Sequence, residues 1–398
     1  MRFETTKISD LISEISMGPF GSNIKVECFV DDGIPVLNGS NLEGFVLKED
    51  SFRYVTEEKA DSLGRANARK GDVVITHRGT LGQIVFIPAD SKHDRYVISQ
   101  SQFRVRCNER ILPEYLVYYF HTRIGQHKLL SNASQVGVPA LARASTTFQT
   151  IEIEVPSISE QTKIVSILET IRKKIELNEQ INNNLLQQAQ AVFAKEFLSF
   201  DTTPEGWKES SLLGIADYLN GLAMQKFRPK DGENGLPVLK IKELRQGSCD
   251  ASSELCSPSI KKEYIVHDGD VIFSWSGSLL VDFWCGGTCG LNQHLFKVTS
   301  TSFDKWFFFA WTDHHLQKFA AIAADMATTM GHIKREELAK AEVLVPPQAE
   351  YERIGGLLAP IYDLVVANRI ENRKLATLRD ELLPRLMSGD LDVSEVSI

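Results

Sequence analysis

The sequence predicts an α+β protein with two similar globular domains, each followed by a long helix. The two helices are expected to pair as an antiparallel coiled coil with pseudo-two-fold symmetry. Three observations carry this prediction: blocks of sequence recur in the same order in both halves, each half begins with short strand-like runs, and each half ends in a long stretch with heptad spacing. We expect the first domain at 1–155 with its helix at 156–200, and the second domain at 201–345 with its helix at 346–390.

The composition agrees with two domains and limits the class of protein. The chain has 398 residues, of which 43% are hydrophobic, which is enough for at least two cores. It contains no run of about 18 apolar residues, and its first residues, MRFETTKISD, are charged where a signal peptide would be apolar. We therefore expect a soluble, cytoplasmic protein. The formal net charge of −8 does not indicate a nucleic-acid binder, so any basic surface must be local.

The repeat is visible in several pairs of blocks. IPVLNGSNLEG (34–44) matches LPVLKIKELRQG (236–247), and GDVVITHRGTLGQIVFI (71–87) matches GDVIFSWSGSLLVDFW (269–284). Further pairs are 98–120 with 291–310, 132–139 with 326–333, and 153–168 with 343–358. Insertions and deletions fall between these blocks, which is typical of loops on a shared scaffold.

Each half reads as strands followed by a helical segment and a closing strand. In the first half the strands are VVIT (73–76), IVFI (84–87) and QFRVRC (102–107), separated by Gly, Asp and Asn. A helix is indicated at EYLVYYFHTRIG, and the alternating IEIEV (151–155) closes the half. Each half is thus expected to be a mixed α+β domain of roughly 150 residues.

A period near 3.5 residues follows Pro156, and it predicts a helix of about 40 residues and about 60 Å. Ser157 and Glu160 have the spacing of a capping box, and the second copy keeps Glu350 but has Pro347 in place of the serine. The predicted seam comprises Ile164, Leu168, Ile171, Ile175, Asn178, Asn182, Leu185, Ala189 and Val192 in the first helix, and Ile354, Leu358, Ile361, Val365, Asn368, Asn372, Leu375 and Leu382 in the second.

The second helix is expected to kink or end early at Pro384, with Gly389 at a terminating position. If the helices cover 159–198 and 349–388 in antiparallel order, their midpoints fall at Asn178 and Asn368. Because a polar residue in a seam fixes register, we predict a contact between these two asparagines. The alternative is two solvated side chains.

Two similar halves, each followed by a helix that starts VPSISEQTKIVSIL or VPPQAEYERIGGLL, resemble the specificity (S) subunit of Type I restriction-modification systems. GDVVITHRGTLG and GDVIFSWSGSLL inside the halves, and ELNEQINNNL and VANRIENRKL in the helices, carry the same resemblance. It departs from the pattern where Tyr351 replaces the glutamine found at Gln161, and where Ser276 replaces the arginine found at Arg78.

The resemblance implies two target recognition domains that read the two parts of a split DNA sequence, with the helices as spacer and docking platform. The partners would be double-stranded DNA, methyltransferase subunits and restriction subunits. S-adenosylmethionine and ATP would bind those subunits, and this chain would hold no cofactor. Since the halves differ in sequence, the target should be asymmetric, with half-sites about one helical turn, ~34 Å, apart or a little less. Helix faces outside the seam, near Gln187, Gln188, Phe193 and Phe197, would bind the catalytic subunits, unless the two phenylalanines pack on their own domain.

DNA contacts are expected where the two copies differ within the shared frame, because base readout needs exposed donors and acceptors and phosphate contact needs Lys and Arg. The candidates are Lys25, Asn38, Ser40, Asn41, His77, Arg78, Gln135 and Arg143 in the first half, and Lys226, Arg228, Lys240, Lys242, Arg245, Lys334 and Arg335 in the second. At each position the alternative is a merely solvated side chain. For Gln100 and Gln293, which match each other, a buried structural hydrogen bond is preferred to base contact.

The sequence offers no catalytic constellation. It has no Asn/Asp-Pro-Pro-aromatic loop, no GxxxxGK[ST] phosphate loop and no GxSxG turn. The six cysteines form no CxxC pair, and reduced thiols are preferred to a zinc site at Cys285, Cys289 and His294. The alternative function is a coiled-coil scaffold whose globular halves bind proteins, which the acidic balance slightly favours.

Overall fold

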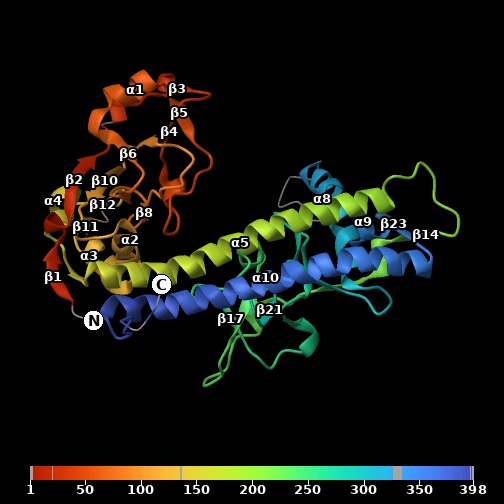
Figure 1. The fold of residues 1–398 in the computed structure, drawn as a ribbon. Helices are drawn as coiled ribbons and strands as arrows, with labels where there is room; N and C mark the ends of the chain where they lie inside the picture. Colours follow the sequence, from red (N-terminus) through yellow and green to blue (C-terminus); the bar gives the residue numbers. More distant parts are fainter. Residues whose placement is uncertain (1–2, 20, 135–136, 326–333, 395, 397–398) are drawn as a thin grey trace. The chain divides into compact units, whose positions relative to one another are not determined.

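The computed structural model describes residues 3–19, 21–134, 137–325, 334–394 and 396. It contains two compact units, one made of Met1–Arg172 with Thr377–Ile398 and the other of Lys173–Ala376. Two long helices, α5 (Ile158–Phe197) and α10 (Gln348–Ser388), each continue from one unit into the other (Figure 1). Each unit therefore holds one globular half of the chain and one end of both helices. The segment boundaries expected from the sequence remain a prediction.

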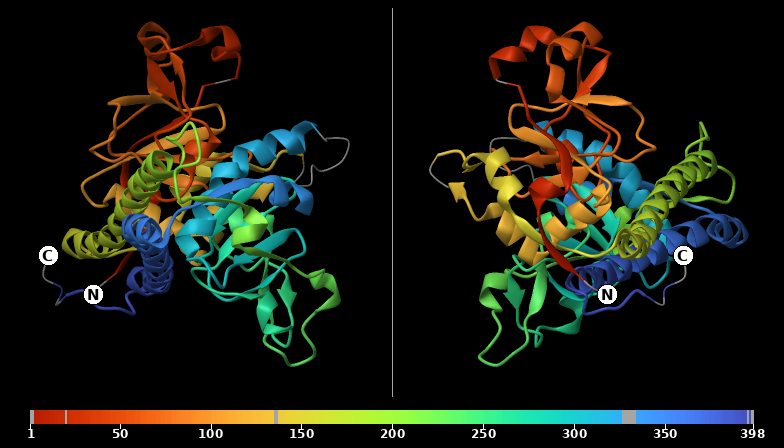
Figure 2. Two further views of the ribbon diagram at one scale, coloured as in Figure 1. Left: turned by 90° about the vertical axis from the view of Figure 1, so that its right-hand side faces the viewer. Right: turned by 60° about the vertical axis from the view of Figure 1, so that its left-hand side comes forward.

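The first unit has two main sheets. One is antiparallel in the order β2-β10-β7-β8, and the other has the order β3-β5-β4-β9-β6 with only the β4–β9 pair parallel. Figure 2 shows the second sheet (red and orange) at the end of the unit away from α5. The strands are β1 (Glu4–Lys7), β2 (Ile12–Met17), β3 (Phe29–Val30), β4 (Ile34–Val36), β5 (Arg53–Val55), β6 (Asn67–Arg69), β7 (Asp72–Thr76), β8 (Ile84–Phe86), β9 (Arg95–Val97), β10 (Gln102–Cys107), β11 (Ala133–Ser134), β12 (Ala140–Leu141) and β13 (Glu152–Val155), and the helices are α1 (Glu57–Ser62), α2 (Pro113–His121), α3 (Arg123–Leu130) and α4 (Ala144–Thr150).

The second unit repeats these sheets. An antiparallel sheet has the order β15-β22-β19-β20, and a second sheet has the order β17-β16-β21-β18 with β16 and β21 parallel. The strands are β14 (Lys208–Ser211), β15 (Asp217–Asn220), β16 (Leu236–Leu239), β17 (Leu255–Cys256), β18 (Ile265–Val266), β19 (Val271–Ser274), β20 (Leu280–Phe283), β21 (Cys289–Leu291), β22 (Leu295–Thr299) and β23 (Glu342–Val345), and the helices are α6 (Leu212–Ile215), α7 (Ile241–Gln246), α8 (Lys305–Asp325) and α9 (Arg335–Lys340). The sequence repeat thus corresponds to a repeat of strand order, although the block at 326–333 lies outside the described residues.

A buried charge cluster follows the repeated Gly-Asp pair. Every residue of β7 is buried, and the Asp72 carboxylate accepts hydrogen bonds from the Arg69 backbone N–H (2.9 Å) and from Arg106 Nε (2.8 Å). Arg104, 4% exposed, lies 3.4 Å from the same carboxylate and 2.8 Å from Glu14. In the second unit Asp270 accepts from the His267 N–H and pairs with Lys297 at 2.7 Å. Because a carboxylate that is buried or half-buried needs such partners, the repeated aspartate, at the start of β7 and just before β19, is held by a backbone N–H and a basic side chain in both halves.

The ends of the long helices match the sequence signals, with one exception. Ser157 Oγ accepts from the Glu160 N–H at 3.3 Å while Glu160 Oε2 accepts from the Ser157 N–H at 3.0 Å, so the capping box is confirmed. Gly389 has φ +80° and follows the last helical residue, as expected of a terminating glycine. An early end of α10 at Pro384 is wrong, because the helix continues to Ser388, while the alternative of a kink at Pro384 stays a prediction.

The last turn of α10 is held by its side chains. Leu383, Leu386 and Met387 are buried in the core of the first unit together with Ile164 and Leu168 of α5. Pro384 stands one turn before the helix end, where the loss of a single backbone hydrogen bond is offset by this burial.

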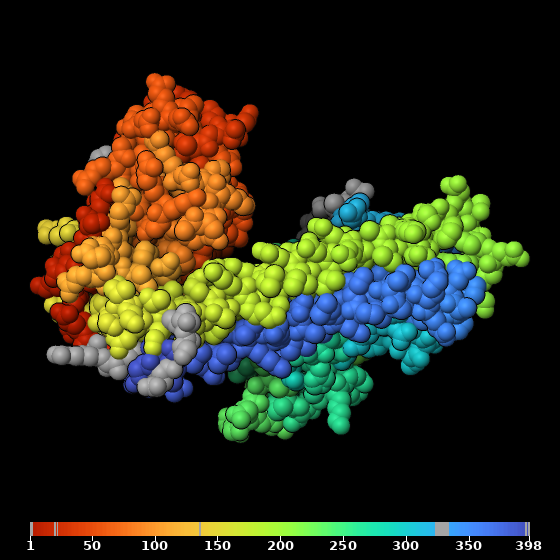
Figure 3. Space-filling model, viewed as in Figure 1, coloured from red at the N-terminus to blue at the C-terminus, as the bar shows by residue number. Residues whose placement is uncertain are grey.

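In the second unit, α5 and α10 lie side by side (Figure 3) and are joined in antiparallel order by two asparagine pairs. Asn178 Nδ2 donates to Asn372 Oδ1 at 2.8 Å, and Asn368 Nδ2 donates to Asn182 Oδ1 at 2.9 Å. The Asn178–Asn368 contact predicted from the helix midpoints is therefore wrong. Both asparagines lie in the seam, buried, so the alternative of two solvated side chains is wrong as well.

The spacing of the seam explains the observed pairs. Seam positions follow at intervals of three, four and three residues, at Ile175, Asn178, Asn182 and Leu185 on α5 and at Val365, Asn368, Asn372 and Leu375 on α10. Antiparallel helices match these intervals only when Asn178 faces Asn372 and Asn182 faces Asn368. A contact of Asn178 with Asn368 would place Asn182 opposite Leu364, which is 46% exposed and lies outside the seam.

Beyond the asparagines, the seam residues divide between the cores of the two units. Ile164, Leu168 and Ile171 are buried in the first unit, and Ile354, Leu358 and Val365 in the second, while Ile175, Leu185, Ile361 and Leu375 are half-buried. The phenylalanines considered for partner binding belong to these cores. Phe193 and Phe197 are buried against Trp311 of the second globular half, so they are not available to catalytic subunits, and the alternative that they pack on their own domain is wrong as well. Gln187 and Gln188 are exposed.

Substitutions of Asn182 and Asn368 should have coupled effects on the free energy of unfolding. In Asn368→Leu, the buried Oδ1 of Asn182 loses its hydrogen-bond donor, and we expect the free energy of unfolding to fall by about 1–3 kcal/mol. The double variant Asn182→Leu with Asn368→Leu leaves no orphaned amide and should recover most of this loss. Urea unfolding of the full chain gives the free energy of unfolding for each member of this double-mutant cycle. Asn183→Leu, on the exposed face of α5, is the control. Additive single effects would contradict the pairing.

Asp72 should contribute far more stability than a surface carboxylate of the same unit. Asp72→Asn removes a charge partner of buried Arg104, and we expect a loss of about 3 kcal/mol in the free energy of unfolding. The matched control is Asp94→Asn, because Asp94 is exposed and pairs with Lys70 at 2.7 Å, and such pairs contribute about 0–1 kcal/mol. Equal effects of the two substitutions in urea unfolding would contradict the assignment.

Candidate nucleic-acid interface

The turn after β4 and its copy after β16 are built on one buried side chain each. Asn41 is 0% exposed, accepts from the Asn38 N–H at 2.9 Å, and donates to the carbonyl oxygens of Lys48 and Asp50. The corresponding Glu243 is buried and accepts from the Lys240 N–H at 3.2 Å. Asn41 was a candidate DNA contact, and we remove it because its amide is buried and fully used within the domain.

The same turns present different side chains at their rims. Asn38 and Ser40 in the first half correspond to Lys240 and Lys242 in the second. Asn38 Oδ1 caps the short 3-10 helix Gly39–Leu42 by accepting from the Ser40 N–H at 2.8 Å. Lys240 pairs with Glu254 at 2.6 Å, and Lys242 lies 3.4 Å from Asp250. The two lysines would have to exchange these carboxylates for phosphates in order to bind DNA.

A second pair of loops follows the central strands β7 and β19. Arg78 is exposed, and within the described residues it makes no ion pair, which leaves its guanidinium available. Its counterpart Ser276 is 1% exposed and lies 3.2 Å from His294 Nδ1, so no contact is expected there. His77, half-buried beside Arg78, bonds through Nε2 to the Gln100 carbonyl at 3.1 Å. Burial, with the neighbouring Arg78, lowers the pKa of His77 below its usual value, so its ring is neutral at pH 7.

The remaining candidates are exposed on loops and helix starts. Arg143 has φ +46°, a left-handed backbone, immediately before α4. Lys334 and Arg335 start α9, where Arg335 Nη1 also donates to the Tyr218 carbonyl at 3.4 Å. The other exposed candidates are Lys25, Lys226, Arg228 and Arg245. Gln135 lies outside the described residues.

The matching glutamines differ from the expectation. Gln100 is exposed, so a buried structural hydrogen bond is wrong at that position, whereas the half-buried Gln293 has its Nε2 3.3 Å from His294 Nε2 within the domain. The buried amide of the first half belongs to Gln102, which accepts from the Ser99 N–H at 2.8 Å and donates to the Asn38 carbonyl at 3.2 Å. Gln102 is the first residue of β10 and points into the core. Gln100 lies in the turn before this strand and is exposed.

Sequence reasoning missed Arg53. It lies on β5, opposite Val36 of β4, with its guanidinium carbon 5.1 Å from the centre of the Phe29 ring. The sequence did contain an indication of this residue, because the corresponding residue of the second half, Glu254, carries the opposite charge. That correspondence becomes visible only when the strand pairing is known.

Two further observations concern other chemistry. All six cysteines are free, and in the part of the chain that the structure describes no group of three or more His, Cys, Asp or Glu side chains is arranged to hold a metal ion. Of the helices described, none combines the length and the apolar composition needed to cross a membrane.

Comparison with known proteins identifies similar chains over nearly the full length. The family model described as the Type I restriction modification DNA specificity domain matches residues 4–187 and again residues 204–379. The Type I restriction enzyme MjaIX specificity subunit of Methanocaldococcus jannaschii is 22% identical, with 99% of this chain and 94% of that protein covered. The HindI specificity subunit of Haemophilus influenzae is 20% identical, with 87% and 93% covered. The crystal structure of an S subunit from M. genitalium shares the fold, with a TM-score of 0.60, 12% identity, and 97% and 96% of the chains covered.

The lowered pKa of His77 gives a testable dependence of stability on pH. The unfolded chain takes up this proton near pH 6.5 and the folded chain only at lower pH, so the stability that the neutral ring contributes is present above pH 6.5 and is lost as the pH falls below it. In His77→Gln, which keeps a donor for the Gln100 carbonyl, we expect the free energy of unfolding to fall less between pH 7 and pH 5. An unchanged pH dependence in urea unfolding would contradict a neutral His77.

Proposed function

Because the chain belongs to the family of Type I restriction modification DNA specificity domains, we propose that it is a non-catalytic DNA-recognition subunit that reads a bipartite, asymmetric site. One observation carries the proposal. The two halves share strand order and buried turn residues, yet they differ in the exposed side chains that those turns present.

The differences have the chemistry of DNA readout. Arg78 faces solvent where the second half has the buried Ser276, and Asn38 stands where the second half has Lys240. Carboxamide and guanidinium groups pair with base edges, while lysines mainly contact phosphate. Two domains of the same fold that expose different side chains in corresponding turns would each recognise a different half-site.

The long helices supply a docking surface for methyltransferase and restriction subunits, which would bind S-adenosylmethionine and ATP themselves. On α10 of the second unit, Leu357 and Leu364 are 47% and 46% exposed and stand two helical turns apart on the same side. Exposed leucines at this spacing are typical of a helix that packs against a partner.

Exchange of the halves tests the proposal. We expect the chain to co-purify with the methyltransferase subunit of its own system, and plasmid DNA from cells that hold both to carry methylated adenine within a split, asymmetric sequence. Replacement of residues 1–150 by the equivalent segment of a relative should change one half of that sequence, and replacement of 207–342 the other half. Sequencing of the modified bases measures the outcome.

The same experiment distinguishes the scaffold alternative. If the subunits associate but methylation does not depend on this chain, the globular halves bind protein and not DNA. Loss of both half-sites on exchange of one half would contradict independent readers.

A further inference from the structure

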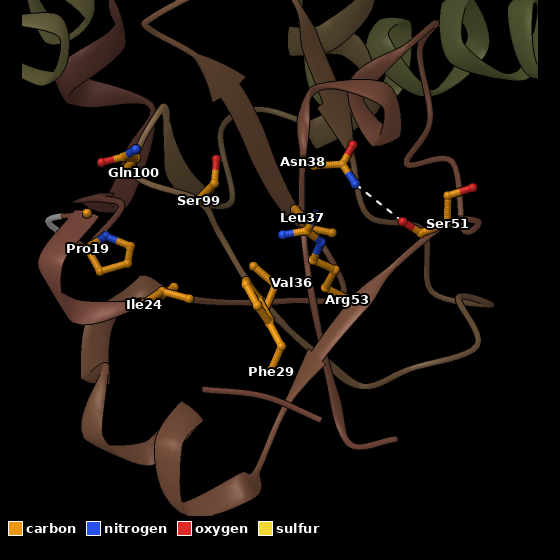
Figure 4. Close-up of a pocket in the computed structure, with 11 residues that line it drawn as sticks. Pro19, Ile24, Phe29, Val36, Leu37, Asn38, Ser51, Arg53, Ser99 and Gln100 are labelled. Carbon is orange, nitrogen blue, oxygen red and sulfur yellow. Dashed lines mark hydrogen bonds between the residues drawn. The ribbon is translucent and has the colours of Figure 1, made fainter. Parts of the chain in front are cut away.

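A cavity of about 450 Å³ opens on the second sheet of the first unit (Figure 4). Its apolar wall is formed by Ile24, Phe29 and Val36, and its rim carries Arg53 and Gln100. The other lining residues include Asn38 and Ser51. This size and composition, an apolar wall with a few convergent polar groups, are typical of a site for a small organic ligand or a part of a larger one.

Two polar side chains at the cavity have unused hydrogen-bonding groups. The Arg53 guanidinium lies over the Phe29 ring at 5.1 Å, and among the described residues it makes neither an ion pair nor a hydrogen bond. The Gln100 carboxamide likewise has no partner among them, and it occupies the space next to Gly21, where a Cβ would lie 2.2 Å from Gln100 Oε1. Ser51 has φ +54°, and its carbonyl accepts from Asn38 Nδ2. Strained backbone of this kind is often found at binding sites.

The second half closes the same place with an ion pair. Ile34 pairs with Val55 in the first unit as Leu236 pairs with Cys256 in the second, so Arg53 corresponds to Glu254. Asn38 corresponds to Lys240, and Lys240 and Glu254 are joined at 2.6 Å. Asn38 and Arg53 leave the cavity of the first half open, whereas the corresponding Lys240 and Glu254 form an ion pair across the same place in the second half.

We propose that this cavity seats one unpaired nucleobase, and the proposal rests on the DNA-reading function proposed above. A base displaced from a duplex needs a planar partner, and both an aromatic ring and an arginine guanidinium serve as stacking platforms. The carboxamide of Gln100, which has no partner among the described residues, offers a donor and acceptor pair that matches a base edge. The carboxamide of Asn38 holds the rim in place, because it is engaged with Ser40 and Ser51.

A neighbouring hollow fits the phosphate that accompanies such a base. It is lined by His77 and Arg78 and shares Gln100 with the cavity. The guanidinium of Arg78 makes no ion pair within the described residues, so this hollow offers a positive charge beside the base site. The first half of the protein would then recognise its half-site by capture of a base, and the second half would recognise its half-site by surface contacts alone.

The test measures the preference for an unpaired base. The full chain, in complex with its methyltransferase subunit, is titrated with duplexes that contain the methylated sequence, either fully paired or with one mismatched base at each position of the first half-site in turn. We expect one position at which the mismatch strengthens binding by ~10-fold, a factor typical of one stacked base. In the variant Asn38→Lys with Arg53→Glu, which copies the bridge of the second half, this ratio should fall to about 1.

Controls separate the cavity from charge and folding. Arg123→Glu, at an exposed position on α3, changes the net charge in the same sense and should keep the wild-type ratio. If the bridged variant fails to fold by circular dichroism, Phe29→Leu keeps an apolar wall, removes the stacking ring and should also lower the ratio. A ratio near 1 at every position in the wild type, or a ratio unchanged in these variants, overturns the assignment to a DNA base.

A further arm distinguishes a base of DNA from a free nucleotide. Competition with deoxynucleoside monophosphates that is lost in Phe29→Leu, together with no preference for mismatched DNA, would assign the cavity to a free nucleotide. Specific binding of paired DNA with no mismatch preference and no such competition refutes the cavity proposal alone. Absence of any specific DNA binding refutes the proposed function itself.

Discussion

The rest of the structure depends on one constraint, the register in which the seam residues of α5 face those of α10. Seam residues follow at intervals of three, four and three residues on both helices, and only one antiparallel register aligns them. Hydrogen bonds between Asn178 and Asn372 and between Asn182 and Asn368 occupy the two central layers of this seam in the second unit. A shift of either helix would bury these amides against apolar side chains, at the cost of an unpaired polar group. Register therefore comes from polar residues, and stability comes from the apolar layers on either side.

The helices are also part of the globular cores. Phe193 and Phe197 of α5 and Tyr351 and Ile354 of α10 lie in the core of the second unit, while Ile164 and Leu168 pack with Leu386 in the first. A change in helix register would consequently disturb how each domain is built, because the same residues serve both. This sharing explains why the compact units cut across the helices and do not follow the boundaries of the repeat.

Features set by local sequence were predictable, and features set by distant partners were not. Heptad spacing indicated the two long helices α5 and α10, the capping box indicated where α5 begins, and the short apolar runs indicated β7, β8 and β10. The continuation of α10 past Pro384 depends on packing against the first unit, which a proline rule does not include.

The candidate site was only partly predictable for the same reason. Arg78 and Lys25 are exposed as expected, whereas Asn41 is buried because its amide supports the turn from within. Arg53 escaped notice because its relation to Phe29 and Asn38 crosses three strands. The asparagine register, in contrast, followed from seam intervals already present in the sequence, and the helix midpoints were the wrong guide to it.

The way each half closes has a topological consequence. Strand β1 pairs with β13 and β14 pairs with β23, each in a two-stranded sheet of its own, so each globular domain starts and ends at one place. At the C-terminal end of α10, Gly389 lies against the ring of Phe3. Within the first unit, the start of β1 and the end of α10 therefore lie next to each other. A circular permutant opened between Phe197 and Trp207, with a linker that joins the C-terminal side of Gly389 to Phe3, would keep every described strand pair, both asparagine layers and both cores.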